Sequence, residues 1–223
     1  MMTNLFDIFD PSSSTSMSIN WLSMVYFILV IPVVFWSVPS KYQMLWNMIL
    51  EGISGELKTA LNKYGMMNIL IFISLFIFIF LNNFISLFPY IFTSTSHISI
   101  SISMSLMIWF SMMFFGWWNF SNHMFIHLTP LGTPKVLMPF MVMIELISSV
   151  IRPLTLSVRL SANIIAGHLL ITLMSQSSKM LNIVMIIVLV LVQCVLMSLE
   201  VAVSLIQSYV YSILSTLYSS EMS

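Results

Sequence analysis

The sequence has very few charged residues and almost no cysteine, and both shortages restrict what the chain can be. Only 6% of its 223 residues are Asp, Glu, Lys or Arg, whereas a soluble domain carries about 25%. Such a chain cannot cover a water-facing surface, so most of its area must face lipid. Cys194 is the single cysteine, which excludes an internal disulfide framework and a multi-cysteine metal site.

Several functional signals are also missing. The seven basic and seven acidic residues cancel, which argues against nucleic-acid binding because that needs a basic surface. Residues 1–20 contain Asp7 and Asp10 but no Lys or Arg, so a signal or transit peptide is not expected there. No G-x-x-x-x-G-K-[ST] loop for a nucleotide occurs. His123 and His127 have a metal-ligand spacing but no acidic or thiolate neighbour, so neither a metal nor a cofactor is predicted.

Long apolar runs are what the chain does contain. With a mean hydropathy of +1.04, they predict an all-α integral membrane protein with a single membrane domain over 1–223. Helix is expected even at 97–119, where Ile and Ser alternate, because an isolated strand leaves its backbone unpaired in lipid. Pro32 is expected to kink the first span. After an N-terminal segment (1–20), the predicted shorter spans are 21–38, 66–89 and 97–119.

Residues 41–65 have a different pattern. Apolar side chains such as Tyr42, Ile49 and Leu57 recur at helical spacing, with Lys and Glu at other positions. This pattern predicts an amphipathic helix that lies in the membrane interface. A helix that faces a soluble partner would show the same pattern, and that alternative stays open.

The last two apolar segments, 136–174 and 180–218, are longer than a membrane requires. Each would be about 58 Å long as a straight helix, roughly twice the thickness of the hydrocarbon core. They must therefore tilt steeply or bend, and Pro153 favours a bend. Because only SQSSK (175–179) joins them, they are predicted to form an antiparallel hairpin. The expected total is about five membrane-embedded helices plus the interfacial one.

Four ionisable residues fall inside this hairpin: Glu145, Arg152, Arg159 and Glu200. Each costs at least ~2.5 kcal/mol at the membrane centre, which makes it a functional candidate. Glu145, Arg152 and Arg159 are seven residues apart and share a helical stripe, so Glu145 can also be a purely structural partner of Arg152. Arg159 then needs another counter-charge, either from Glu200 or from a carboxylate on another subunit.

Uncharged polar residues extend this pattern on both helices. Asn163 lies one turn after Arg159, and His168, nine residues on, points to the opposite face. Carboxylate, imidazole, amide and hydroxyl groups can relay protons or hold water, and they do not resemble a selectivity filter for a larger cation. The second stripe, on the last helix, consists of Glu200, Ser204, Gln207 and Tyr211.

Three runs resemble the subunit a (subunit 6) family of mitochondrial ATP synthases, and the resemblance extends over essentially the whole chain. They are IELISSVIRPLTLSV (144–158), RLSANIIAGHLL (159–170) and LEVAVSLIQSYVYSIL (199–214). The resemblance implies a subunit encoded in the organelle and placed in the mitochondrial inner membrane beside a ring of c subunits and a peripheral stalk. ATP chemistry would then belong to partner subunits.

The resemblance also implies residue roles. Arg159 would face the ring carboxylates, and Glu145 would lie in the proton exit path to the matrix. Arg152, Ser204 and Tyr211 would be supporting residues. The half-channel from the intermembrane space would be lined by Asn163, His168, Glu200 and Gln207.

Two other classes of membrane protein remain as alternatives. A proton-coupled transporter or a membrane subunit of a respiratory complex would favour internal repeats and lysines inside the spans, and the sequence has neither. A purely structural anchor would have spans free of charge, which leaves Glu145, Arg159 and Glu200 unexplained.

Overall fold

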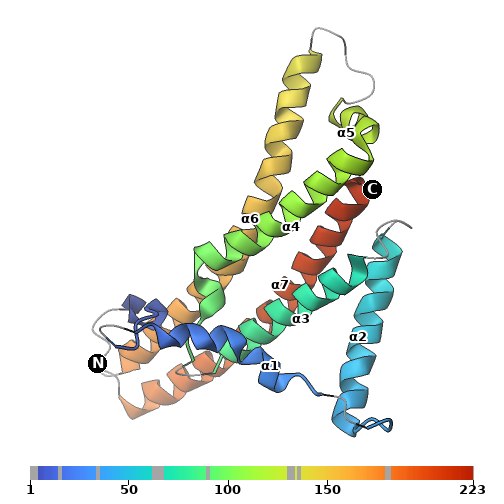
Figure 1. Ribbon diagram of the computed structural model, residues 1–223. Coiled ribbons are helices and arrows are strands. Elements are labelled where there is room, and N and C mark those ends of the chain that lie inside the picture. The colour runs from blue at the N-terminus through green and yellow to red at the C-terminus, as the bar shows by residue number, and fades with distance from the viewer. Residues whose placement is uncertain are drawn as a thin grey trace.

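The protein is described by a computed structural model that covers residues 5–14, 17–33, 36–61, 68–88, 91–129, 134, 137–178 and 182–222. All regular structure in these ranges is helical (Figure 1), which confirms the predicted all-α class. The predicted element ends at 62–67, 89, 136 and 180 lie outside the described residues. Four helices are long and apolar enough to cross a membrane, namely α3 (Ile69–Ser86), α4 (Ile98–Asn119), α6 (Met138–Ser177) and α7 (Ile183–Met222).

The first predicted span, 21–38, is replaced by a shorter helical segment. A 3-10 helix (Ile19–Val25) continues into α1 (Phe27–Val30), and together they are about 21 Å long, too short for a hydrocarbon core of ~30 Å. Ile31 is extended, with φ −70° and ψ 122°. Because the ring of Pro32 disfavours helix at the residue before it, the proline ends this segment rather than kinking it.

The predicted amphipathic helix is α2 (Lys41–Ala60). A capping box begins it: the Gln43 backbone N–H donates to Ser40 Oγ at 3.4 Å, and the Ser40 backbone N–H donates to Gln43 Oε1 at 2.9 Å. Near its other end Leu57 is buried in a cluster with Phe72 of α3. The Tyr209 hydroxyl of α7 donates to Glu56 Oε2 at 2.6 Å, so α2 is attached to both α3 and α7. Its position in the interface stays a prediction.

The Ile/Ser alternation is helical, as predicted. It opens α4, and on a helix its serines fall on different faces: Ser101 and Ser105 are each 3% exposed, while Ser103 is exposed. Their hydroxyls donate to carbonyls three residues earlier, at 2.8–3.1 Å, so none is left unpaired in an apolar setting. Short η4 (Ser94–Ser96) precedes α4, and α5 (Ser121–Leu128) follows it.

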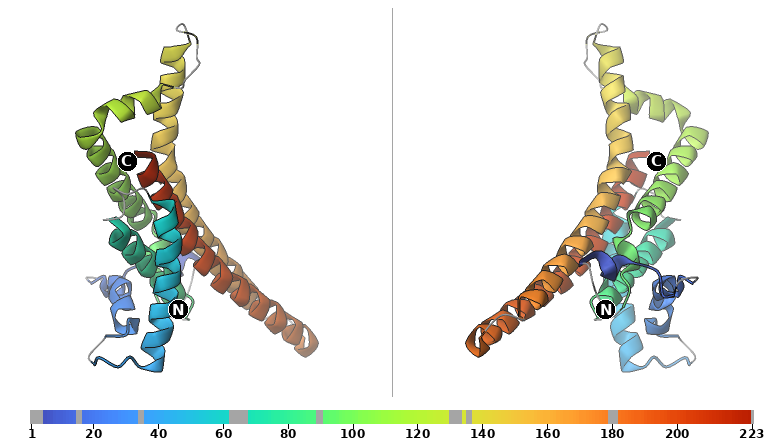
Figure 2. Two further views of the ribbon diagram at one scale, coloured as in Figure 1. Left: turned by 90° about the vertical axis from the view of Figure 1, so that its right-hand side faces the viewer. Right: turned by 90° about the vertical axis from the view of Figure 1, so that its left-hand side faces the viewer.

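The two longest helices run antiparallel, as predicted for the hairpin. Figure 2 shows α6 and α7 side by side where α6 ends and α7 begins, extending past the other helices, while the first part of α6 stands apart. Pro153 lies inside α6, where it lacks the N–H that would bond to the carbonyl of Ser149, and α6 changes direction along its length (Figure 2). The steep tilt to the membrane stays a prediction.

Small hydroxylated residues line the buried face of α7. Ser208, Ser212 and Thr216 have no exposed surface, and their hydroxyls donate to carbonyls three residues earlier on the same helix. Small side chains allow helix backbones to approach closely within a membrane. This face lets α7 pack closely against α3, while α6 packs most closely against α4.

Candidate functional site

Arg159 lies on the outward face of α6. Its side chain is exposed, and within the described part of the chain no carboxylate lies within 4.0 Å of its guanidinium. Glu200, one of the two candidate counter-charges, therefore does not pair with it. Instead, Gln207 of α7 donates its Nε2–H to the Arg159 carbonyl oxygen at 2.6 Å. This bond fixes the backbone of α6 at Arg159 and leaves the cationic side chain directed away from the helix bundle.

A polar pocket lies on the other side of α6, between α3, α6 and α7. It offers a volume of about 30 Å³ to water, room for about two molecules since one needs roughly 10–15 Å³. His168 lines it while Arg159 is exposed, as their spacing of nine residues predicts. The polar lining comes from Asn83 and Ser86 of α3, Asn163 and His168 of α6, and Glu200, Ser204 and Gln207 of α7.

The Glu200 side chain packs directly against the backbone of Gly167. A Cβ atom added at Gly167 would lie 2.6 Å from Glu200 Oε1 and 3.0 Å from its Cδ, closer than side-chain packing allows. Glycine at this position therefore makes room for the carboxylate inside the hairpin. The sequence shows a glycine in RLSANIIAGHLL but does not show which side chain occupies the space.

Several polar atoms of this pocket are buried without a hydrogen-bond partner among the described residues. They are Glu200 Oε2, Gln207 Oε1 and both polar side-chain atoms of Asn83. A buried polar atom without a partner costs on the order of 1–3 kcal/mol, and ordered water is the usual remedy in a polar pocket. The arrangement is therefore suited to hold water beside a carboxylate and an imidazole.

Asn83 and Ser86 are the polar residues of this pocket that sequence reasoning missed. They are 1% and 4% exposed and lie in the apolar run predicted as the span 66–89. The signal that was available is the pair Asn82–Asn83 with Ser86 one turn later, a polar face near the end of an otherwise apolar helix.

A second pocket lies further toward the C-terminal end of α7. It offers about 20 Å³ to water, and the hydroxyl of Tyr211 there is buried without a partner in the described residues. The stripe predicted from Glu200 to Tyr211 does lie on one side of α7, but it divides between two pockets. The second is lined by Ser105, Trp109, Pro153, Leu156, Tyr211, Ser215 and Tyr218, among others.

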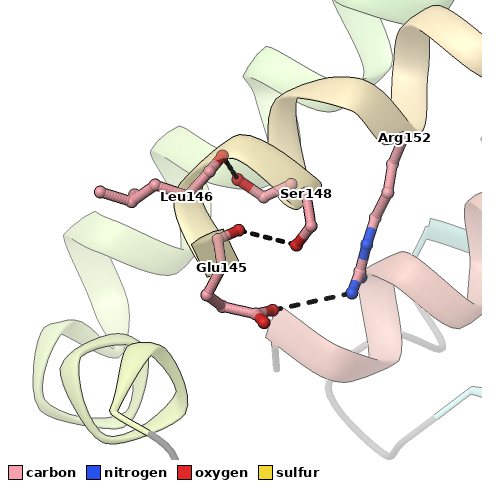
Figure 3. Close-up of polar contacts among 5 residues, drawn as sticks. Glu145, Leu146, Ser148 and Arg152 are labelled. Carbon is pink, nitrogen blue, oxygen red and sulfur yellow. Dashed lines mark hydrogen bonds and ion pairs between the residues drawn. The ribbon is translucent and has the colours of Figure 1, made fainter. Parts of the chain in front are cut away.

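Glu145 and Arg152 form the intrahelical ion pair that their spacing allows. Figure 3 shows the two side chains extending toward each other from positions two turns apart on α6, with Arg152 Nη2 3.8 Å from Glu145 Oε1. The Ser148 hydroxyl donates to the Glu145 carbonyl at 2.8 Å. The Arg152 guanidinium also lies 5.2 Å from the centre of the Tyr218 ring, within cation–π range.

Arg159 is situated between the two pockets along both helices. On α6 the first pocket is lined by 163–168 and the second by 153–156, with Arg159 between them. On α7 the corresponding stretches are 200–207 and 211–218, and the bond from Gln207 to the Arg159 carbonyl joins the helices at that level.

Comparison with known proteins identifies the family. The family model described as "ATP synthase A chain" matches residues 17–220. The chain belongs to this family. It is 52% identical over 223 residues to "ATP synthase subunit a" of Drosophila melanogaster, covering 100% of both chains. It is 53% identical to the proteins of the same name from Anopheles gambiae (225 residues) and Locusta migratoria (224 residues), again with 100% of each covered.

Membership of this family makes the chain a membrane-sector ATP synthase subunit with several membrane-spanning helices. Most of the apolar part of α7 is not covered by the other helices of this chain. Lipid or neighbouring subunits must therefore surround it, which agrees with this role.

On the proton-conducting function proposed below, Gly167→Ala is expected to lower conduction while leaving assembly intact. The new methyl group displaces the Glu200 carboxylate, which is the movable end of a side chain, so the helices need not separate. Gly52→Ala is the matched control, since nothing lies within 4 Å of a Cβ there, and it should be neutral or stabilise α2 by about 0.5–1 kcal/mol. The measurement is the rate of passive proton uptake by membrane vesicles that carry either variant. Equal conduction in the two variants would contradict the importance of this contact.

Proposed function

We propose that this chain is the proton-conducting stator subunit of the membrane sector of a rotary ATP synthase in the mitochondrial inner membrane. The observation that carries the proposal is the placement of Arg159 between two pockets, with its guanidinium on the exposed face of α6. Two separate pockets divided by a fixed cation provide two half-channels that do not communicate directly.

The first pocket is the half-channel on the side from which protons arrive. Glu200 and His168 are the groups in it that exchange protons, while Asn163, Gln207 and Asn83 hold water between them. A proton moves along this water to a carboxylate on the neighbouring c-subunit ring and neutralises it. The neutral carboxyl group can then enter the lipid phase, because the charged form is much more costly there.

Arg159 acts at the boundary between the half-channels. A guanidinium keeps its proton under all conditions in proteins, so it cannot pass protons from one pocket to the other. Its exposed position allows it to meet each ring carboxylate in turn and to favour the ionised form. A ring carboxylate that arrives protonated therefore releases its proton into the second half-channel before it reaches Arg159.

The second pocket belongs to the exit path on this proposal. Tyr211 provides a hydroxyl at its wall, and the pair of Glu145 and Arg152 lies beyond it, joined to it by the contact of Arg152 with Tyr218. Both members of the pair are about one-third exposed, at 35% and 30%, and on this proposal their exposed side faces water. Glu145 can accept the proton and pass it to the matrix while Arg152 holds its position.

Glu200→Gln is the direct test of the first half-channel. Gln fits the same space but cannot bind and release a proton, so proton conduction should fall by about tenfold or more while the complex still assembles. Glu56→Gln, which changes a carboxylate that bonds to Tyr209 outside the pocket, should conduct normally. The measurement is the rate of passive proton flow into vesicles. An unchanged rate in Glu200→Gln would overturn the role of Glu200 in the first half-channel.

The proposed partners are the c-subunit ring, the peripheral stalk and other membrane-sector subunits. Native electrophoresis of gently solubilised membranes, followed by mass spectrometry, tests them. The chain should comigrate with ATPase activity and with a small proteolipid that carries a carboxylate. Comigration with a redox complex or a lone transporter would contradict the proposal.

A further inference from the structure

Thr93–Ser96, in the connection between α3 and α4, are polar and buried, which is unusual for a loop. Thr93, Ser94, Thr95 and Ser96 are each 1–4% exposed. They form η4 and the residue before it, which pack against α3, α4, α6 and the 3-10 helix Ile19–Val25. Figure 1 shows this connection at the end of the bundle where α3 finishes and α4 begins. A buried segment of this composition needs partners for its polar groups.

Only some of those groups find partners among the described residues. Thr93 Oγ1 donates to Ser96 Oγ at 3.0 Å, and the Ser96 hydroxyl donates to the Thr93 carbonyl at 2.7 Å. In contrast, Thr95 Oγ1 and His97 Nε2 are buried without a partner, as is Asn82 Nδ2 of α3. Because each such group is costly in an apolar setting, water is the partner that their chemistry calls for.

These groups continue the polar surface of the first pocket. Asn82 and Asn83 lie four and three residues before Ser86, so each lies close to Ser86 on the surface of α3. Asn83 and Ser86 line the pocket of Glu200 and His168, and η4 packs against the same helix. A layer of buried polar groups thus extends from the pocket to the α3–α4 connection.

His97 is the ionisable residue of this layer. Its ring lies against Trp21, with centroids 5.1 Å apart, and against Phe92 at 5.3 Å. The Ser23 hydroxyl donates to the Phe92 carbonyl at 2.9 Å, which attaches the 3-10 helix over the segment. The ring is therefore held in place, while its Nε2 atom has no partner in the part of the chain that the structure describes.

We propose that Thr93–His97 together with Asn82 forms a hydrated inlet to the first half-channel, in which His97 takes up protons from the aqueous phase. A proton binds at His97 Nε2, leaves to the water beside Thr95 and Asn82, and reaches the pocket of Glu200 past Asn83. This inference rests on the proposed proton-conducting function, and it gives a role to polar atoms that the half-channel alone does not use.

Cysteine labelling in the assembled enzyme tests the hydration. Thr95→Cys is placed in a Cys194→Ser background, and membrane vesicles are treated with a charged methanethiosulfonate, which reacts with thiolates in contact with water. Ser101→Cys is the matched control, since both positions are 3% exposed but the Ser101 hydroxyl already bonds to the Ile98 carbonyl. Labelling at position 95 should be at least about tenfold faster than at position 101, because an apolar setting suppresses the thiolate. Equal rates would overturn the inlet.

His97→Gln tests the role of the imidazole. Passive proton conduction should fall several-fold while native electrophoresis shows the complex intact. Normal conduction in His97→Gln would overturn the role of His97. If His97→Gln does not assemble, the labelling rate at position 95 decides whether the inlet is hydrated. If Glu200→Gln blocks conduction but residue 95 is not labelled, the inlet alone fails. If Glu200→Gln also conducts normally, the proposed function of the pocket fails as well.

Discussion

Replacing Arg159 by alanine is expected to abolish ATP synthesis driven by a proton gradient, even though the complex still assembles. The side chain is on the exposed face of α6 and makes no ion pair within the described residues, so its loss leaves few contacts broken. On the proposed function, what disappears is the fixed cation between the two half-channels, and protons can then pass without turning the ring. ATP synthesis and passive proton flow, measured in the same vesicles, check both parts of this expectation.

Arg152→Ala is the comparison that separates position from charge. It removes an arginine from the same helix, but one already paired with Glu145 and stacked on Tyr218. Truncating it should lower the amount of assembled complex, because a partly buried carboxylate loses its partner. Synthesis per assembled complex should slow because Glu145 loses the side chain that positions it, but it should not be abolished. An Arg159→Ala enzyme that still makes ATP would rule out the proposed barrier.

Ser101→Leu is expected to prevent normal packing of the helices, whereas Ser103→Leu should have almost no effect. On α4 Ser101 is 3% exposed and Ser103 is exposed. A leucine forced into a closely packed helix contact costs about 1–3 kcal/mol or more, while at an exposed position in lipid it is favourable. The amount of intact complex on native gels, with protease resistance of the chain, provides the measurement.

The comparison of Ser101→Leu with Ser103→Leu also tests whether this segment is a helix or a strand. In a strand Ser101, Ser103 and Ser105 would all point to one face, and leucine at any of them would have a similar effect. In the helix Ser105 shares the buried face with Ser101, so Ser105→Leu should resemble Ser101→Leu. Similar tolerance at all three positions would be inconsistent with α4 as described.

The sequence by itself determined the class of the protein and most of its helices. With so few charges the chain must be solvated by lipid, and in lipid the backbone must satisfy its own hydrogen bonds, so helices follow. The 3.6-residue period then placed Glu145 beside Arg152 and put His168 on the face opposite Arg159, because such relations lie within one helix. The motif around Arg159 was sufficient to indicate the family.

Only the tertiary structure decided which helices share a pocket. Asn83 and Ser86 join Glu200 from a helix more than a hundred residues away in the chain, and Glu200 occupies the space above Gly167. The serines of α4 and α7 face inward or outward according to their neighbours, and the polar stripe of α7 divides between two pockets. Periodicity shows which side chains lie on one face of a helix. The neighbouring helix that this face meets depends on packing between distant segments, which no local pattern encodes.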